Sequence, residues 1–383
     1  MIPYGRQSIS TQDIDAVVDV LKSDFLTQGP QVPLFEQKIS ALVDSQYAIA
    51  VNSATSALHI ACLALDVKKG DIVWTSPISF VASANCALYC DAEVNFVDID
   101  LDTGNMSIDA LTHQLEMAAR QGNLPKVLIP VHLSGQSCDM QAIAGLATKY
   151  GFNVIEDASH CIGGQFQNFP IGNCQYSDIC IFSFHPVKIV TSAEGGIATT
   201  NNSELAEKMD LLRSHGITKD PGLMTKATEG LWYYQQLMLG FNYRMTELQA
   251  ALGCSQLEQL TDFVKQRNML RKRYDSAFAN IAEVTPLKIA DNCYSSCHLY
   301  IIKVDAGIHD QLFAHLREHK IGVNLHYIPI YQQPYFEQLN MPFNDCPNAE
   351  QYYRSAISIP LFAQLTLDEQ DHIIETIRAY LCK

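Results

Sequence analysis

The stretch Asp178-Ile-Cys-Ile-Phe-Ser-Phe-His-Pro-Val-Lys188-Ile-Val-Thr-Ser-Ala-Glu194-Gly-Gly-Ile-Ala-Thr-Thr200 decides how this chain folds. Two apolar, β-prone runs, 179–184 and 197–200, flank a segment that is too irregular to be helix or strand. Lys188 lies in that segment, and a buried ammonium is costly unless it is paired or neutralised. A desolvated lysine that loses its proton becomes an amine nucleophile for carbonyl groups. The placement of Lys188 therefore indicates a catalytic lysine that reacts with a carbonyl group.

The residues around Lys188 support this interpretation over that of a surface lysine on a hairpin tip. Polar hydrogen-bonding side chains crowd the segment, namely Ser183, His185, Thr191 and Ser192. The pair Gly195-Gly196 has no side chain and permits close approach of another backbone.

Composition describes an ordinary soluble globular protein of 383 residues, 48% apolar and 17% charged. The length predicts a large domain and a smaller one. No apolar run approaches the ~18–20 residues of a membrane span, and the N-terminus lacks a signal-peptide pattern, so we expect a cytoplasmic protein with no membrane contact. The net charge of −15 argues against general nucleic-acid binding.

The twelve cysteines are scattered through the chain. Cys86 and Cys90 are four residues apart, as are Cys293 and Cys297, but no Cys-x-x-Cys pair occurs. We therefore expect reduced core cysteines and no metal site.

Short apolar runs alternate with helical patterns over some 150 residues of the chain. Strands are expected at 47–51, 72–75, 94–97, 127–131, 154–156 and on both sides of Lys188, with helices such as 139–149 and 204–214 between them. This alternation predicts an α/β fold with a mainly parallel sheet covered by helices on both faces. Ligands of such sheets collect beyond the carboxyl ends of the strands.

The remaining segments predict a second, smaller domain. A capped helix begins at Ser10 and is expected to pack near that domain. Beyond Gly240 come two long helical patterns, and beyond Pro286 comes a separate α/β unit. We divide the chain into a large domain, 1–250, and a small C-terminal α/β domain, 251–383.

Polar residues follow three of the expected strands. Asn52-Ser-Ala-Thr-Ser56 separates a strand from a helix, a turn that suits a phosphate, although most such turns are only helix caps. Ser76-Pro-Ile-Ser-Phe80 and Asp157-Ala-Ser-His160 follow two other strands. An amine lysine, a nearby acid, an aromatic and a phosphate-suited turn together favour a pyridoxal-phosphate site, because that cofactor needs each of these groups.

Several motifs in order along the chain, over roughly residues 5–330, match a known family. They are Leu26-Thr-Gln-Gly-Pro30, Asn52-Ser-Ala-Thr-Ser-Ala-Leu58, Pro77-Ile-Ser-Phe-Val-Ala82, Glu156-Asp-Ala-Ser-His160, Ser183-Phe-His-Pro-Val-Lys188, Glu194-Gly-Gly196, Arg213-Ser-His-Gly216 and Asn242-Tyr-Arg-Met-Thr246. With them the chain resembles the DegT/DnrJ/EryC1/StrS nucleotide-sugar aminotransferases, which are pyridoxal-phosphate enzymes of fold-type I. The large domain would then bind the cofactor.

The resemblance implies a role for individual residues. Lys188 would form the Schiff base and shuttle a proton, Asp157 would pair with the pyridinium nitrogen, and His160 would lie near the ring oxygen. Phe80 would stack on the ring. The phosphate would be held by Ala54, Thr55 and Ser183, with Asn242 reaching in from a second subunit. Substrate contacts are expected from Thr27, Gln28, Arg213, His215 and Tyr331.

Within the family the chain is most similar to 4-aminotransferases of pseudaminic acid biosynthesis. The run 77–82 and Pro329-Ile-Tyr331 carry this likeness, whereas Ser192-Ala193 departs from the Thr-Gly of many relatives. The implied reaction moves an amino group from L-glutamate to C4 of a UDP-linked 4-keto-6-deoxy-N-acetylhexosamine. A homodimer with shared active sites is implied as well.

Three alternatives stay open at this point. One is a transaminase for another keto nucleotide sugar, of the perosamine or bacillosamine type. Another is a 3-dehydratase of the same family, although those enzymes carry His where Lys188 stands. The third, from another class, is a non-catalytic pyridoxal-phosphate-binding regulator, which would normally carry a DNA-binding module.

Overall fold

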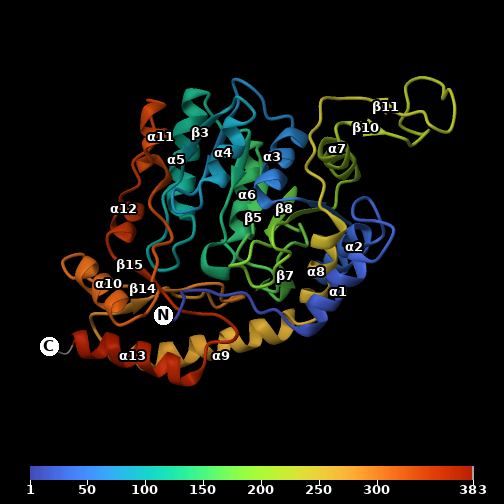
Figure 1. The fold of residues 1–383 in the computed structure, drawn as a ribbon. Helices are drawn as coiled ribbons and strands as arrows, with labels where there is room; N and C mark the ends of the chain where they lie inside the picture. The colour runs from blue at the N-terminus through green and yellow to red at the C-terminus, as the bar shows by residue number, and fades with distance from the viewer. Residues whose placement is uncertain (382–383) are drawn as a thin grey trace.

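A seven-stranded sheet runs through the middle of the molecule in the computed structural model, which describes residues 1–381 (Figure 1). The strand order is β1-β9-β8-β5-β4-β2-β3. The strands are β1 (Tyr47–Val51), β2 (Ile72–Thr75), β3 (Glu93–Phe96), β4 (Val127–Ile129), β5 (Asn153–Asp157), β8 (Ile179–Ser183) and β9 (Gly196–Thr200). Pairing is parallel from β3 to β8, and β9 runs antiparallel to both of its neighbours. The prediction of a mainly parallel sheet is confirmed.

The antiparallel step has a local cause. Residues 184–195, between β8 and β9, form no helix or strand. A parallel return would need a crossover that passes over one face of the sheet, usually as a helix. The chain instead doubles back directly, and Lys188 lies in the loop that makes the reversal. Every residue of β8 and β9 is buried, as expected of strands covered on both faces.

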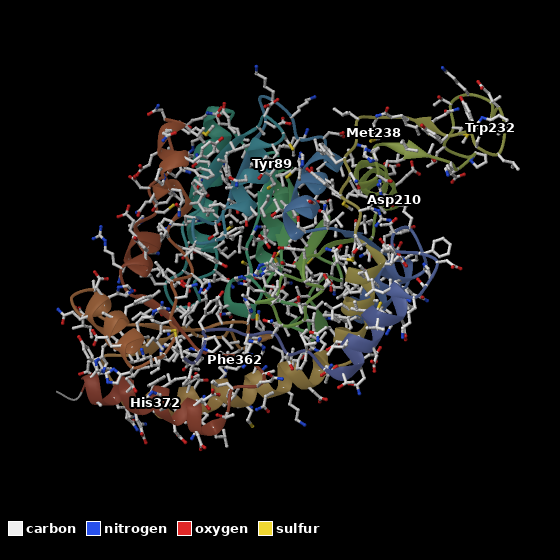
Figure 2. All side chains as sticks on the ribbon, in the orientation of Figure 1. Tyr89, Asp210, Trp232, Met238, Phe362 and His372 are labelled. Atoms are coloured by element: carbon white, nitrogen blue, oxygen red, sulfur yellow. The ribbon has the colours of Figure 1, made fainter. Side chains whose placement is uncertain are left out.

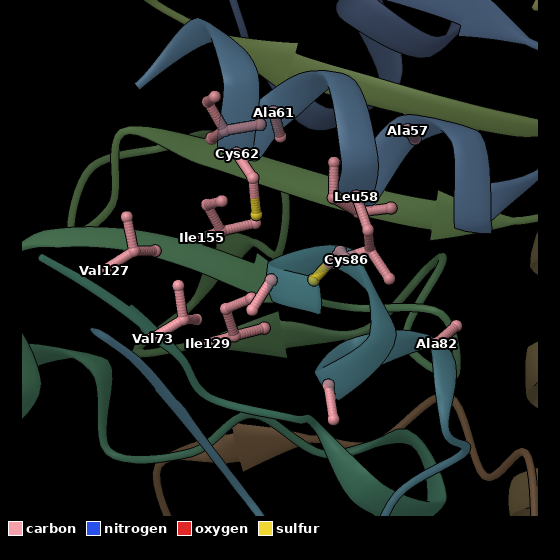
Figure 3. Close-up of a cluster of buried hydrophobic side chains, with 14 of the residues drawn as sticks. Ala57, Leu58, Ala61, Cys62, Val73, Ala82, Cys86, Val127, Ile129 and Ile155 are labelled. Carbon is pink, nitrogen blue, oxygen red and sulfur yellow. The ribbon is translucent and has the colours of Figure 1, made fainter. Parts of the chain in front are cut away.

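Helices cover both faces of the sheet. On one face lie α3 (Ala54–Ala64), α4 (Ala82–Leu88) and α7 (Ser203–Arg213). Figure 3 shows how Leu58 and Cys62 of α3 and Cys86 of α4 pack against Ile129 and Ile155 of the sheet. The other face is covered by α2 (Gln31–Val43), α5 (Ile108–Gln121), α6 (Met140–Tyr150) and α8 (Glu247–Leu257).

The cysteines contribute to these cores. In residues 1–381 the cysteines are free, and all but Cys293 are buried. They act there as small apolar side chains.

A separate core forms in the C-terminal part of the chain. The small antiparallel sheet β12 (Thr285–Pro286), β14 (Tyr300–Lys303) and β15 (Ala356–Ile359) packs with α9 (Leu260–Phe278), α10 (His309–Glu318) and α13 (Leu367–Leu381). The expected α/β unit after Pro286 is therefore present. The domain boundary at 250 and 251 stays a prediction.

Shorter elements complete the chain. A projecting arm contains the two-residue strands β10 (Ile217–Thr218) and β11 (Gln235–Gln236) (Figure 1). The others are β6 (Gln165–Phe166), β7 (Phe169–Pro170), β13 (Cys293–Tyr294), α11 (Pro334–Gln338) and α12 (Pro347–Tyr353), with single 3-10 turns at Leu133–Gly135 and Ile330–Gln332. Within residues 1–381, no helix is both long and apolar enough to cross a bilayer.

The N-terminal helix α1 (Thr11–Leu21) begins where the sequence predicts. The Ser10 hydroxyl accepts a hydrogen bond from the Asp13 amide, and the Asp13 carboxylate accepts one from the Ser10 amide in return. Asp13 also accepts from the Gln256 side-chain amide at 2.7 Å. This contact ties the start of α1 to α8, against which α1 packs.

Glu247, at the first position of α8, caps a second helix. Its carboxylate is fully buried and accepts hydrogen bonds from the amides of Gln31 at 2.6 Å and Val32 at 3.3 Å. These amides begin α2, whose own cap residue Pro30 supplies no side-chain hydrogen bond. A carboxylate there also complements the positive end of the helix dipole.

We therefore expect Glu247→Ala to lower the free energy of unfolding by about 2 kcal/mol, because it leaves two partly buried amides at the start of α2 without an acceptor. Glu247→Gln, which keeps one acceptor oxygen, should lose less. Urea unfolding at one fixed protein concentration measures the change. Glu258→Ala is the control, because Glu258 makes an exposed ion pair with Lys38, worth at most about 1 kcal/mol. Equal losses for Glu247→Ala and Glu258→Ala would contradict the capping role.

Candidate active site

A cavity of about 700 Å³ opens beyond the carboxyl ends of β5 and β8. It brings together seven of the residues singled out from the sequence, namely Ala54, Thr55, Phe80, Asp157, His160, Ser183 and Lys188. A shallower hollow of about 860 Å³ lies against α2, β1 and α7. Of the predicted site residues it contains only Arg213, so the cavity around Lys188 is the candidate site.

The loop that carries Lys188 is held by its own backbone and by one hydroxyl. The Lys188 amide donates to the His185 carbonyl at 2.8 Å, and the Ser192 amide donates to the Phe184 carbonyl at 2.9 Å. The Thr191 hydroxyl also donates to the Phe184 carbonyl. Burial lowers the pKa of Lys188 to about 8, although the negative charge of Asp157 opposes the shift. About a tenth of the amine is thus unprotonated at pH 7, far more than for an ordinary lysine, and this is the form that acts as a nucleophile.

Asp157, the last residue of β5, is oriented by two serines. The Ser83 hydroxyl donates to Asp157 Oδ2 at 2.6 Å. The Ser159 hydroxyl, at 2.6 Å, and the Ser159 amide, at 3.1 Å, both donate to Oδ1. Ser83 is held in turn by a hydrogen bond with Ser79 at 2.7 Å. The carboxylate is buried, and these donors fix its direction.

The N-terminus of α3 has hydrogen-bond donors to spare. The Ser53 hydroxyl caps the helix by accepting from the Ser56 amide. The amides of Ala54 and Thr55 and the hydroxyls of Thr55 and Ser183 make no hydrogen bond within residues 1–381. Since all of these groups line the cavity, a phosphate there would meet several donors at a helix N-terminus.

Gly196 allows this arrangement. A Cβ atom built at Gly196 would lie 2.4 Å from the Ala54 amide nitrogen and from the Ser53 carbonyl carbon. Any side chain would push the α3 N-terminus away from β9. The close approach expected of this glycine is confirmed.

Phe80 and His160 also line the cavity, and both rings lie near the ring of Tyr327. Phe80 is 60% exposed, unusually open for a large apolar side chain that lines a cavity. His160 Nδ1 accepts a hydrogen bond from the Ser134 amide at 3.3 Å, and its Nε2 lies 3.3 Å from the Tyr327 hydroxyl. Burial and then the charge of Lys188 lower the pKa of His160 well below its usual value. The ring is therefore neutral, with its proton on Nε2.

The other predicted residues lie outside this cavity. Thr27, Gln28, His215 and Asn242 are exposed. The Arg213 guanidinium pairs with Glu36 and Asp210 and donates to the Ala50 carbonyl at 2.7 Å. Tyr331 packs against Phe96, with ring centroids 5.7 Å apart. Their expected contacts with substrate or cofactor stay predictions.

The sequence did not single out several residues that line the cavity. Tyr4, His298, Asn324, His326, Tyr327 and Gln333 belong to this group. Nothing local to the segment 326–334 indicates that it lies beside Lys188. Ser159 lies inside the motif Glu156–His160 and Ser83 directly follows the motif Pro77–Ala82, so both could have been found as donors to Asp157.

Comparisons with protein-family models and with curated proteins point to the same family. The model of the DegT/DnrJ/EryC1/StrS aminotransferase family matches residues 7–378. The Bacillus subtilis spore coat polysaccharide biosynthesis protein SpsC is 36% identical over 98% of this chain and 96% of its own length. The Campylobacter jejuni UDP-4-amino-4,6-dideoxy-N-acetyl-beta-L-altrosamine transaminase is 36% identical over 100% of this chain and 98% of its own length.

Solved structures agree with these matches. PseC of Helicobacter pylori, described as an aminotransferase of pseudaminic acid biosynthesis, superposes with a TM-score of 0.90 at 31% identity, covering 99% of both chains. The putative sugar aminotransferase Spr1654 of Streptococcus pneumoniae, in its PLP form, gives 0.87 at 28% identity, covering 99% of this chain and 98% of that one.

These matches extend over nearly the whole chain, and the cavity of this chain contains a lysine of lowered pKa beside an oriented carboxylate. The chain belongs to the DegT/DnrJ/EryC1/StrS aminotransferase family, and it is an aminotransferase of fold-type I.

Proposed function

We propose that this enzyme is a pyridoxal-phosphate-dependent transaminase of pseudaminic acid biosynthesis that works in the cytoplasm. It would move the amino group of L-glutamate to C4 of a UDP-linked 4-keto-6-deoxy-N-acetylhexosamine. The observation that carries the proposal is the location of Lys188, with its lowered pKa, in a cavity that also contains Asp157. The full-length similarity to the Campylobacter transaminase and to PseC supports the choice of substrate.

The residues of the cavity fit pyridoxal phosphate. Lys188 can bind its aldehyde, Asp157 can pair with its ring nitrogen, and Phe80 offers an open aromatic face for its ring. The unused donors at the start of α3, with Ser183, suit its phosphate. When bound, the cofactor supplies an electron sink for the carbon that carries the amino group.

The protein side chains then have separate tasks. The carboxylate of Asp157, oriented by Ser83 and Ser159, keeps the ring nitrogen protonated by its negative charge. The Nζ atom of Lys188 can take a proton from the α-carbon of the amino acid and deliver it to the carbon of the cofactor that receives the amino group. Its pKa of about 8, close to neutral pH, suits both steps. His160, whose proton is on Nε2, holds the Tyr327 hydroxyl at the edge of the cavity.

One observation favours a second candidate for the nucleotide-sugar substrate. SpsC, a spore coat polysaccharide protein, is as similar to the chain as the Campylobacter transaminase is. A keto nucleotide sugar of another type, such as a perosamine or bacillosamine precursor, is therefore the second candidate.

The direct test incubates the purified protein with L-glutamate and a set of UDP-4-keto sugars and identifies the amino sugar by NMR. We expect a yellow protein that forms the 4-amino product, with borohydride fixing the cofactor to Lys188, as peptide mapping would show. Lys188→Ala should abolish turnover, since no other Lys or Arg in residues 1–381 lines the cavity. Product formation by Lys188→Ala at the wild-type rate would refute the mechanism. If the NMR spectrum shows a different amino sugar, the proposed sugar substrate is wrong, although the transaminase function stands.

Asp157→Asn should lower turnover by orders of magnitude while folding changes little, because the amide keeps the shape and can accept hydrogen bonds but has no charge. Steady-state turnover and thermal unfolding measure the two effects. Asp109→Asn serves as control, because Asp109 is exposed on α5. A merely twofold loss for Asp157→Asn would assign the pyridinium contact to another residue.

We further propose that the enzyme is a homodimer with shared active sites. The arm around β10 and β11 exposes apolar side chains, and Figure 2 shows Trp232 near its tip, away from the body of the molecule. Leu231 is fully exposed and Leu239 is 81% exposed, which is typical of a surface that another chain covers. Asn242 follows this arm and is exposed, so it is free to reach a partner's cofactor phosphate.

A mixed-dimer experiment tests the shared site. Lys188→Ala chains and Asn242→Asp chains are each inactive or impaired, but a mixed dimer contains one site with Lys188 intact and wild-type Asn242 from the partner. Random exchange at equal amounts makes half of the dimers mixed, so activity should return to about a quarter of the wild-type value. With subunit exchange verified and Asn242→Asp shown to be folded and impaired, no recovery would rule out sharing.

A further inference from the structure

His298 has an unexplained position in the cavity wall. It lies just before β14, in the C-terminal part of the chain, and it is a buried residue that lines the cavity. Its Nδ1 atom is sealed from solvent without a hydrogen-bond partner, and its Nε2 atom makes no hydrogen bond within residues 1–381. Buried polar atoms are nearly always paired. Because Nδ1 is sealed, Nε2 is the ring nitrogen that can contact a molecule bound in the cavity.

The backbone around His298 is firmly held. Arg267 donates to the His298 carbonyl at 3.2 Å, and the Ser134 hydroxyl donates to the Leu299 carbonyl at 2.9 Å. The Ser296 hydroxyl donates to the His160 carbonyl at 2.8 Å. The His298 ring is thus positioned in advance, with its centroid 4.4 Å from that of His160.

Burial decides where the His298 proton lies. A neutral imidazole has one N–H donor and one acceptor nitrogen. An N–H at the sealed Nδ1 atom would be a buried donor without an acceptor, which is costly. With the proton on Nε2, the nitrogen that is not sealed, the N–H has access to the cavity and only a lone pair is left unpaired at Nδ1; orphaned N–H groups are rarer than unpaired acceptors, so we place the proton on Nε2. Burial lowers the pKa of His298, and the neighbouring His160, which would repel it if protonated, and the positive charges of Lys188 and Arg267 lower it further, so the ring stays neutral and offers one N–H.

The amino donor supplies an acceptor for this N–H. Its nitrogen must reach the place that Lys188 Nζ serves, and the α-carboxylate carbon of any amino acid lies only about 2.5 Å from that nitrogen. Within residues 1–381, Lys188 is the only Lys or Arg that lines the cavity. Of the groups of this chain that line the cavity, neutral donors are therefore the ones available to the carboxylate, and a hydrogen bond to a charged acceptor is about twice as strong as a neutral one.

We propose that His298 contacts the amino donor, with its Nε2–H donating to the donor's α-carboxylate. This assignment rests on the proposed transaminase function. It makes His298 a determinant of amino-donor binding, and it leaves binding of the nucleotide sugar to other residues.

Two variants separate the two nitrogens. The glutamine side chain of His298→Gln would place an amide N–H near the position of Nε2, whereas the shorter side chain of His298→Asn reaches only the position of Nδ1.

The first measurement follows the half-reaction with L-glutamate through the visible absorbance of the cofactor and, separately, the KM of the keto sugar. His298→Asn should weaken glutamate binding by about tenfold or more, and His298→Gln by at most about threefold. The sugar KM should change less than twofold in both. His113→Gln, at an exposed position on α5, is the control and should change neither value.

The outcomes separate this proposal from the proposed function. If wild-type enzyme shows no half-reaction with glutamate, the transaminase function itself fails. If wild type reacts but His298→Asn binds glutamate normally, only the assignment of His298 is overturned. A rise in the sugar KM with glutamate binding unchanged would also overturn it, since His298 would then contact the sugar.

A second measurement does not depend on catalysis. In cofactor-free protein labelled with ¹⁵N-histidine, long-range ¹H–¹⁵N NMR distinguishes the two neutral tautomers from the imidazolium. We expect the ring signals that disappear in His298→Gln to show the Nε2–H tautomer at pH 7. An Nδ1–H tautomer or an imidazolium there would refute the argument.

Discussion

The parallel pairing of β5 with β8 is the contact on which the site depends. It sets Asp157 opposite Ile181, two residues before the end of β8. The carboxyl ends of the two strands therefore meet at one edge of the sheet. The acid that ends β5 and the lysine loop that follows β8 thus face the same cavity, although 30 residues lie between Asp157 and Lys188 in the sequence.

The reversal from β8 to β9 brings the N-terminus of α3, which suits a phosphate, to the edge of the cavity. Because β9 pairs antiparallel with β1, Gly196 lies opposite Val51, at the end of the strand that leads into α3. The missing side chain at Gly196 lets the α3 N-terminus lie directly against the sheet edge. The absence of a side chain at Gly196 thus lets the end of the lysine loop pack closely against the N-terminus of α3, whose amides are free to bind an anion.

The charge balance of the cavity fits an enzyme that must keep an amine reactive. Lys188 provides its positive charge and Asp157 and Glu194 its acidic groups, and burial keeps His160 and His298 neutral. Neutral imidazoles can donate hydrogen bonds to a substrate without the added desolvation cost of further buried cations. Burial also lowers the pKa of His326 to about 3, so His160, His298 and His326 are all uncharged at neutral pH.

Local sequence determined much of this protein. The apolar runs around Lys188, the cap at Ser10 and the polar residues after β1 and β5 were all predictable, because strand burial, helix capping and turn chemistry act over a few residues. Asp157 and Lys188 could be paired because parallel strands end at a common edge. The family motifs then added roles to these positions.

Only the tertiary structure decided the rest of the cavity. His298 and Tyr327 lie more than 100 residues beyond Lys188, and no local pattern shows that the C-terminal core places them beside it. Tyr327, rather than Tyr331, lines the cavity, since the packing of Tyr331 on Phe96 turns that ring elsewhere. Whether a polar atom is sealed, as His298 Nδ1 is, depends on every neighbour that surrounds it, and those neighbours come together only when the chain folds.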